Sequence, residues 1–368
     1  MDVRVVVVLG GAEPGAEVFS GIPLALLPVL GRSMLERTLR SLRDFGFAHT
    51  TIVSEYAATE LPDDVHWIRV QPSLLWRTVQ KTFEDLSRAG ANLVLVLRMG
   101  PYAEIDYPEL LQFHVDQANR VTAIVRPDGE FLHAFLIDAS RRNDAAYLFR
   151  HGLKTPRLPH SPYEFAGYAN ALAVAGDLRR IAIDAFCGNS DVQPDGAEIK
   201  PGVWAAQSAQ IHKRARVLAP AYIGAHARVR ASAVITRCSA LEHHAHVDCG
   251  TVVDNATLLP DTSVGAGLDV AHAVVGFRRF AHLGRKVDIE IADRTLVSTV
   301  SRPPVRLLGL VASLAGYLPV QIVRGFFSGA QAPPATLPEA VQSPPPALKE
   351  AAGEQGINLA AVRRYGNE

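Results

Sequence analysis

The sequence predicts an α/β domain followed by a parallel β-helix. A six-residue repeat runs from Ile199 to Leu259, and alternating strand and helix patterns precede it. The 368 residues allow two or three domains. Lys+Arg and Asp+Glu are 37 each, so the formal net charge is zero and no nucleic-acid partner is indicated. Three sparse cysteines and a first segment unlike a signal peptide predict a cytoplasmic protein.

The N-terminal elements alternate in type. Val3–Leu9 is a short β-branched run that ends at Gly10, which predicts a buried strand. A long loop follows, and Ser33 with Glu36 forms a capping-box pattern that opens a helix to Phe45. Further strands are predicted at Thr50–Val53, Trp67–Val70, Leu93–Leu97 and Val121–Val125, and further helices at Leu74–Arg88 and Pro108–Asn119. Such alternation predicts a largely parallel sheet, with ligands at the carboxyl ends of its strands.

Two stretches carry a family resemblance. Val8–Ala12, followed by Ile22–Arg32, resembles the opening of sugar-1-phosphate nucleotidyltransferases, and Leu95–Leu97 with Glu104–Asp106 resembles their metal-binding strand end. The resemblance implies a Rossmann-like nucleotidyltransferase domain followed by a left-handed β-helix. It also implies transfer of a nucleotidyl group from a nucleoside triphosphate to a sugar 1-phosphate. The nucleotide-binding loop would be Leu9, Gly10, Gly11 and Ala12, and Mg²⁺ would be the cofactor.

The chain departs from this family pattern at its charged positions. Leu24 stands at the position of the family's sugar-phosphate Lys, and Gly100 at that of its metal-binding Asp. Glu13 places an acid in the loop that should receive phosphate. Glu104 and Asp106 are the remaining candidate metal ligands, with a solvated turn and a helix N-cap as the alternative interpretation. We therefore expect a catalytically impaired or regulatory member of the family.

The repeat defines two registers in the predicted β-helix. The aliphatic or Ala positions, expected to fill the interior, are Ile199, Ala205, Ile211, Val217, Ile223, Val229, Ile235, Leu241, Val247, Val253 and Leu259. Four residues after each comes a second register, which from Ala209 onward holds only Ala, Ser or Thr. The pattern slips by one residue after Leu259 and resumes at Val264. Each short strand should stack on its equivalent in the next turn of the solenoid.

One histidine cluster supports an alternative function. His243, His244 and His246 lie within one turn of the repeat, beside Glu242 and Asp248. A hexapeptide-repeat acyltransferase that uses acyl-CoA would employ such a His as general base. The register instead favours an outward-facing polar edge, because Leu241 and Ala245 point inward.

The C-terminal part predicts contacts beyond the core. Leu307–Val323 has no charged residue, so 301–328 is predicted to be an apolar helical segment. This segment would cap the β-helix, form an oligomer contact, or touch the membrane through 307–327. Residues 329–368 are rich in Pro and Ala and are predicted to be largely disordered. The predicted domains are 1–190 and 191–300, and a homo-oligomer is expected.

Overall fold

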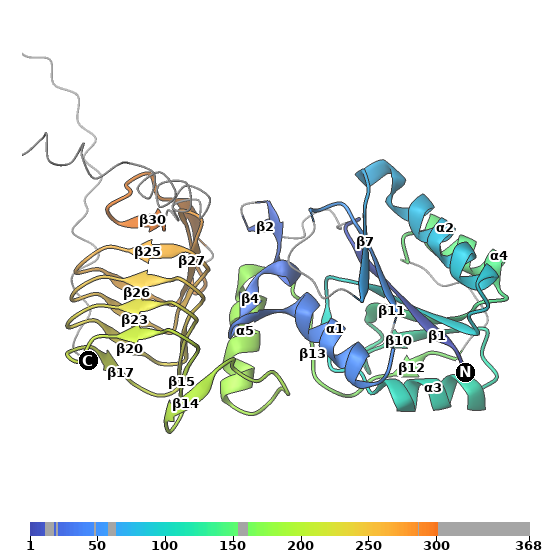
Figure 1. The fold of residues 1–368 in the computed structure, drawn as a ribbon, viewed down its shortest axis with the longest axis horizontal. Helices are drawn as coiled ribbons and strands as arrows, with labels where there is room; N and C mark the ends of the chain where they lie inside the picture. Colours follow the sequence, from blue (N-terminus) through green and yellow to red (C-terminus); the bar gives the residue numbers. More distant parts are fainter. Residues whose placement is uncertain are drawn as a thin grey trace, which may run out of the picture. The chain divides into compact units, whose positions relative to one another are not determined.

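The computed structural model describes residues 1–11, 18–19, 21–47, 49–57, 64–153, 161–285 and 287–300. By their contacts these residues belong to one unit, Met1–Arg302. The predicted segments 301–328 and 329–368, together with Ala12 and Glu13, lie outside the described residues. Within the unit, an α/β region ends with helix α5 (Ala175–Phe186). A region of three sheets, each formed by short strands from successive circuits of the chain, begins at Ala197 (Figure 1).

The α/β region is built on a seven-stranded sheet of order β12-β10-β11-β8-β1-β6-β7. β1 pairs in parallel with both β6 and β8, and β7 is parallel to β6. The strand β11 is antiparallel to β8 and β10, so the sheet is mixed. The strands are β1 (Val3–Leu9), β6 (Thr50–Ser54), β7 (Val65–Arg69), β8 (Leu93–Arg98), β10 (Val121–Val125), β11 (Phe131–Asp138) and β12 (Tyr163–Glu164).

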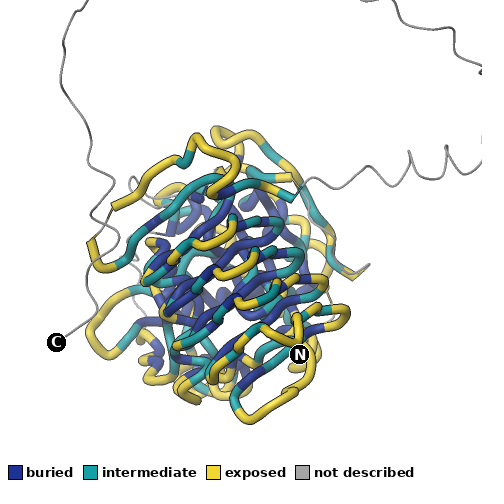
Figure 2. Tube along the Cα trace, turned by 90° about the vertical axis from the view of Figure 1, so that its left-hand side faces the viewer, coloured by how far each residue is buried: buried dark blue, intermediate teal, exposed yellow. Residues whose placement is uncertain are grey.

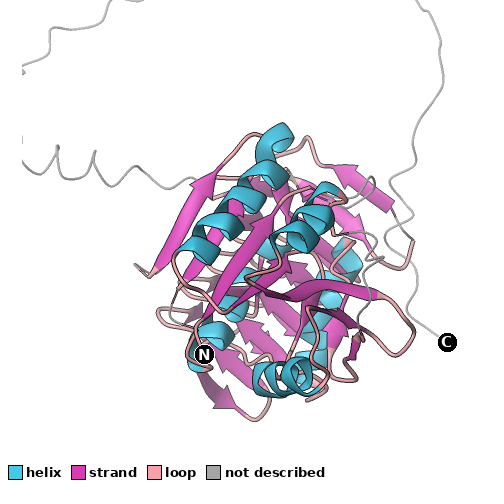
Figure 3. Cartoon of the chain, turned by 90° about the vertical axis from the view of Figure 1, so that its right-hand side faces the viewer, coloured by secondary structure: helices cyan, strands magenta, loops and turns pink. Residues whose placement is uncertain are grey.

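Helices cover both faces of this sheet (Figure 3). Odd and even positions of β1 point to opposite faces, as the pleat requires. Val6 and Val8 pack with α2 (Leu75–Arg88) and α4 (Arg142–Arg150), whereas Val5 and Val7 pack with α1 (Met34–Asp44) and α3 (Tyr107–Asp116). The predicted strands and helices are confirmed within a few residues. The described residues of the predicted loop from Gly10 to Arg32 form short elements: β2 (Val18–Phe19), β3 (Ile22–Pro23), η1 (Leu24–Leu26), β4 (Pro28–Val29) and β5 (Arg32–Ser33).

From Val203 the chain passes through three sheets in turn, one short strand in each. Val203 pairs with Ala221, so one circuit takes 18 residues, or three hexads. The three sheets have the orders β14-β15-β18-β21-β24-β27-β28-β29, β16-β19-β22-β25-β30 and β17-β20-β23-β26, and their strands are mostly parallel. Buried stretches recur along successive circuits, with exposed stretches between them (Figure 2).

The strands of this three-sheet region are short. In the first sheet they are β14 (Ala197–Lys200), β15 (Val203–Ala205), β18 (Ala221–Ile223), β21 (Ser239–Leu241), β24 (Thr257–Leu258), β27 (Ala273–Gly276), β28 (Arg279–His282) and β29 (Val287–Glu290). In the second they are β16 (Gln210–Ile211), β19 (Arg228–Val229), β22 (His246–Val247), β25 (Thr262–Val264) and β30 (Val297–Thr299). In the third they are β17 (Arg216–Val217), β20 (Val234–Thr236), β23 (Val252–Asp254) and β26 (Asp269–Ala271).

The inward register is confirmed from Ala205 to Val253 and wrong at both ends. Ile199 is 49% exposed because β14 is an antiparallel edge strand. Leu258, not Leu259, faces the interior, since it pairs with Leu241 only 17 residues earlier. This circuit is one residue shorter than those before it, and the difference lies at a corner. Arg237 and Cys238 both have positive φ at one corner, whereas Asn255 makes the equivalent turn alone. The slip therefore lies before Leu259, not after it.

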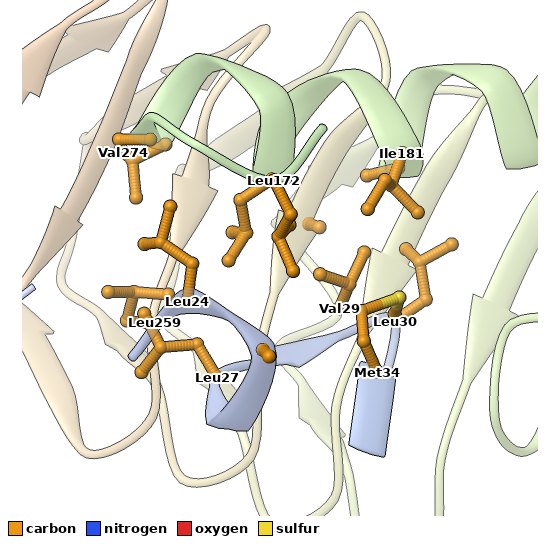
Figure 4. Packing of buried hydrophobic residues seen from close by; sticks show 14 of the residues in the cluster. Leu24, Leu27, Val29, Leu30, Met34, Leu172, Ile181, Leu259 and Val274 are labelled. Atoms are coloured by element: carbon orange, nitrogen blue, oxygen red, sulfur yellow. The ribbon is translucent and has the colours of Figure 1, made fainter. Parts of the chain in front are cut away.

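An apolar cluster joins the two regions (Figure 4). Leu259 and Val274 of the three-sheet region pack with Leu24 of η1 and with residues of α5 such as Ile181. Because the stacked strands turn these side chains outward, the first sheet offers an apolar outer face to the α/β region. No helix among the described residues is both long enough and apolar enough to cross a lipid bilayer.

Candidate functional site

The carboxyl ends of β1, β6 and β8 lie side by side. Leu9 is in register with Ser54, and Val8 with Arg98. The backbone continues this alignment, since Glu55 N–H donates to Leu9 O at 3.0 Å and Met99 N–H donates to Val8 O at 2.8 Å. The structure thus brings Gly10 and Gly11 together with the residues that follow β6 and β8, at the edge where a parallel sheet places its ligand.

A carboxylate occupies the glycine loop. Gly11 N–H donates to Glu55 Oε1 at 3.0 Å, a charge-assisted bond of the kind that a phosphate oxygen would otherwise accept. A Cβ added to Gly10, whose φ is +137°, would lie 2.5 Å from Glu55 Cδ. Glycine is favoured here because L side chains rarely adopt this φ, and the Glu55 side chain lies directly against the backbone.

Trp76 and Arg98 cover the other side of the loop. Trp76 atoms lie 3.3 Å from where a Gly11 Cβ would be and about 3.5 Å from a Gly152 Cβ. The buried guanidinium of Arg98 lies 5.9 Å from the Trp76 ring centroid, within cation–π range. Arg98 also donates hydrogen bonds to the carbonyl oxygens of Gly11 and Gly152. Side chains of α2, of β8 and of the segment after β6 thus lie against the backbone at Gly10 and Gly11.

The cavity at the end of β8 is small. It measures about 20 Å³ and is lined by residues that include Arg98, Met99 and Pro101. That volume suits a single water, whereas small-molecule sites typically measure about 300–1,000 Å³. A larger hollow of about 600 Å³ lies along α2, lined by Arg77 and Lys81 among others, and neither glycine of the loop is among its described lining residues.

The two predicted metal ligands make contacts within the protein. Glu104 accepts hydrogen bonds from Ser190 Oγ at 2.7 Å and from Asp191 N–H at 2.9 Å, and its partial burial raises the pKa of the carboxyl. Asp106 caps α3 by accepting from Glu109 N–H at 3.0 Å, as the alternative interpretation predicted. Within the described residues no group of three His, Cys, Asp or Glu side chains could hold a metal. In this structure both carboxylates therefore accept hydrogen bonds from protein donors.

The two positions that depart from the family pattern have different surroundings. Leu24 is 3% exposed and lies in the cluster between the two regions, near Leu259 and Val274. Gly100 follows β8, and no atom lies within 4 Å of where its Cβ would be. An acid would therefore fit sterically at Gly100, whereas a Lys at Leu24 would enter an apolar core.

Glu242 is the most buried carboxylate of the described residues, and no local sequence pattern predicts its burial. Its side chain leaves the three-sheet region and accepts Leu30 N–H at 2.8 Å and Gly31 N–H at 2.9 Å, one with each oxygen. Leu30 and Gly31 both have positive φ, which points their successive N–H groups at one anion. Complete burial raises the pKa of Glu242 to about 8, while both N–H groups and nearby Arg37 oppose this shift.

The three histidines of the predicted cluster make different contacts. His246 Nε2 accepts a hydrogen bond from Arg230 Nε at 3.2 Å, which ties up the atom a general base would use. His244 stacks on His226 of the preceding circuit, with ring centroids 4.8 Å apart. His243 meets His244 edge-on at 5.9 Å. Leu241 and Ala245 are fully buried, which confirms the register on which the outward-facing interpretation depended.

Comparison with known proteins gives no family assignment. No protein-family model matches this chain. No curated protein matches it significantly either.

Proposed function

We propose that this chain is a catalytically impaired relative of the sugar-1-phosphate nucleotidyltransferases, with a Rossmann-like domain and a left-handed parallel β-helix. Its role would be regulatory or scaffolding, in the supply of nucleotide sugars. The glycine loop after β1, beside the ends of β6 and β8, supports the relationship. The passage of the chain through three sheets with 18 residues per circuit supports the β-helix.

One observation carries the loss of activity: Glu55 accepts the Gly11 N–H. Nucleotidyl transfer requires donors and cations around a triphosphate, because negative charge develops on the reacting phosphate. In this chain a carboxylate holds one of those donors. Its negative charge would also repel phosphate at a contact distance. A triphosphate would have to displace Glu55 from the loop before it could bind there.

The residues at the end of β8 also support the proposed loss of activity. The strand ends in Arg98 and continues with Met99 and Gly100, so no carboxylate follows it directly. The Arg98 guanidinium is held by carbonyl oxygens of Gly11 and Gly152 and lies over Trp76. The positive charge therefore stabilises the backbone at Gly11 and Gly152.

Calorimetric titration with each nucleoside triphosphate tests this proposal. We expect no measurable binding by the wild-type protein at the loop. We expect Glu55→Ala to raise triphosphate affinity about tenfold or more, since a hydrogen bond to a charged group contributes about 1.5–3 kcal/mol. Glu164→Ala, at an exposed position of β12, is the matched control and should change nothing. Tight binding by wild type that Glu55→Ala weakens would contradict the proposal, because Glu55 would then help to hold the ligand.

A further inference from the structure

Residues 199–241 carry a concentrated positive charge. This stretch has no Asp or Glu, although the whole chain is neutral. Its seven cations are Lys200, Lys213, Arg214, Arg216, Arg228, Arg230 and Arg237. Arg237 forms an ion pair with Asp254 at 2.6 Å, and Lys200 lies on the edge strand β14. The other five form one surface.

We name this surface the basic ridge; it consists of Lys213, Arg214, Arg216, Arg228 and Arg230. All five side chains are exposed. Arg216 lies on β17 of the four-stranded sheet and Arg228 on β19 of the five-stranded sheet. The other three lie on the corner where the chain passes between these two sheets. Because two sheets meet there, the surface is a convex edge.

Successive circuits bring the cations to neighbouring, not equivalent, positions: Arg228 lies directly between Gln210 and His246, and Arg216 lies beside Val234. His212 N–H donates to Val229 O, and one circuit later Arg230 N–H donates to Val247 O. The two corners are therefore equivalent and adjacent, and neighbouring strands lie about 4.8 Å apart. That spacing is shorter than the screening length of about 8 Å at physiological salt, so the charges add to one field.

Asp and Glu side chains that the structure describes do not neutralise most of the charge of the basic ridge. Of the described residues, no carboxylate forms an ion pair with Lys213, Arg214, Arg216 or Arg228. Arg230 donates to the His246 ring, an uncharged acceptor. Asp248 lies at the equivalent corner one circuit further along and bounds the ridge on that side.

We propose that the basic ridge binds the surface of an anionic lipid bilayer. A convex edge cannot enclose a nucleic-acid strand, and residues 212–218 and 228–232 offer no Phe, Tyr or Trp on which bases could stack. A bilayer requires only cations facing delocalised phosphates. Leu218, two residues after Arg216, is 43% exposed and adds an apolar side chain just past the other end of the same short strand.

Vesicle co-sedimentation of the full-length chain tests the proposal. We expect binding to phosphatidylcholine vesicles that contain phosphatidylglycerol, weaker binding to phosphatidylcholine alone, and loss of the difference at high salt. The triple variant R216A/R228A/R230A should reduce binding on the order of a hundredfold, because each Lys or Arg near an anionic surface contributes about fivefold. An unchanged melting temperature would show that this variant is folded.

A second triple variant separates the ridge from net charge. R40A/R77A/R150A removes the same charge from exposed positions of the α/β region and should bind vesicles like wild type. Equal loss in both variants would overturn the proposal, as would equal binding to neutral and anionic vesicles. Ridge-dependent binding to duplex DNA or single-stranded RNA that is tighter than binding to vesicles would also overturn it, and would identify a nucleic acid as the partner.

Discussion

Removing the Glu242 carboxylate should loosen the contact between the two regions. Its oxygens accept Leu30 N–H and Gly31 N–H, and Glu242→Ala leaves both donors without these partners. An unsatisfied buried donor costs about 1–3 kcal/mol. Gly31 is only partly buried, so water would satisfy part of its loss. We expect Glu242→Ala to lower the free energy of unfolding by about 2–4 kcal/mol.

The same residue makes stability depend on pH. Burial raises the pKa of Glu242 to about 8 in the folded protein, from an ordinary value near 4.5. Between these values the folded state keeps a proton that the unfolded state releases. Raising the pH across this window therefore lowers the free energy of unfolding, by at most about 1.4 kcal/mol per pH unit. Below the window both states are protonated, and above it both are ionised.

Urea unfolding of wild type and Glu242→Gln across this window measures the effect. Glutamine cannot ionise, so the advantage of wild type over Glu242→Gln should shrink as the pH rises from about 5 to about 8. Glu290→Gln, at an exposed position of β29, is the control and should follow wild type at every pH. A difference that stays constant or widens with pH would refute the reasoning, because Glu242 would then be ionised throughout and the two N–H bonds would outweigh its burial.

Three further substitutions test the packing. Val229→Asp should unfold the three-sheet region, because Val229 is 2% exposed and an unpaired buried carboxylate costs several kcal/mol. Its control, Arg230→Asp, should shift stability by less than about 0.5 kcal/mol. Similar melting curves by circular dichroism for the two variants would show the inward register to be wrong. Leu24→Lys should lower the melting temperature, since it buries an ammonium group in the apolar cluster, and an unchanged melt would place Leu24 outside that cluster. Ser33→Ala should cost about 1 kcal/mol by removing the capping box of α1, against almost nothing for Ser41→Ala in the same helix; equal effects in urea titration would argue against the cap.

The repeat predicted the interior of the three-sheet region but not its outer face. Periodicity decides which side chain points inward, and buried Val229, Ile235 and Leu241 confirm that part. At Leu258-Leu259 both residues are aliphatic, so composition could not choose between them. The single-residue corner at Asn255 makes the choice, and it depends on backbone conformation.

The polar residues of the site were harder to predict for a related reason. Glu242 stands among histidines in the sequence, and its pattern predicts an exposed edge. Its burial depends on Leu30 and Gly31, more than two hundred residues earlier. Glu55 likewise meets Gly11 only because β6 pairs with β1 in one register. Such contacts arise from tertiary pairing, which no local pattern encodes.

Pyrophosphate release tests the proposed loss of catalysis most directly. Purified full-length protein would be incubated with Mg²⁺, each nucleoside triphosphate and several sugar 1-phosphates. We expect wild type to release no pyrophosphate above the blank, because Glu55 holds the Gly11 N–H and no carboxylate directly follows β8. The variant E55A/G100D frees that donor and adds an acid where space is open, so any recovered activity should appear there first. Robust turnover by wild type that Glu55→Ala abolishes would contradict the account and would make Glu55 part of a working active site.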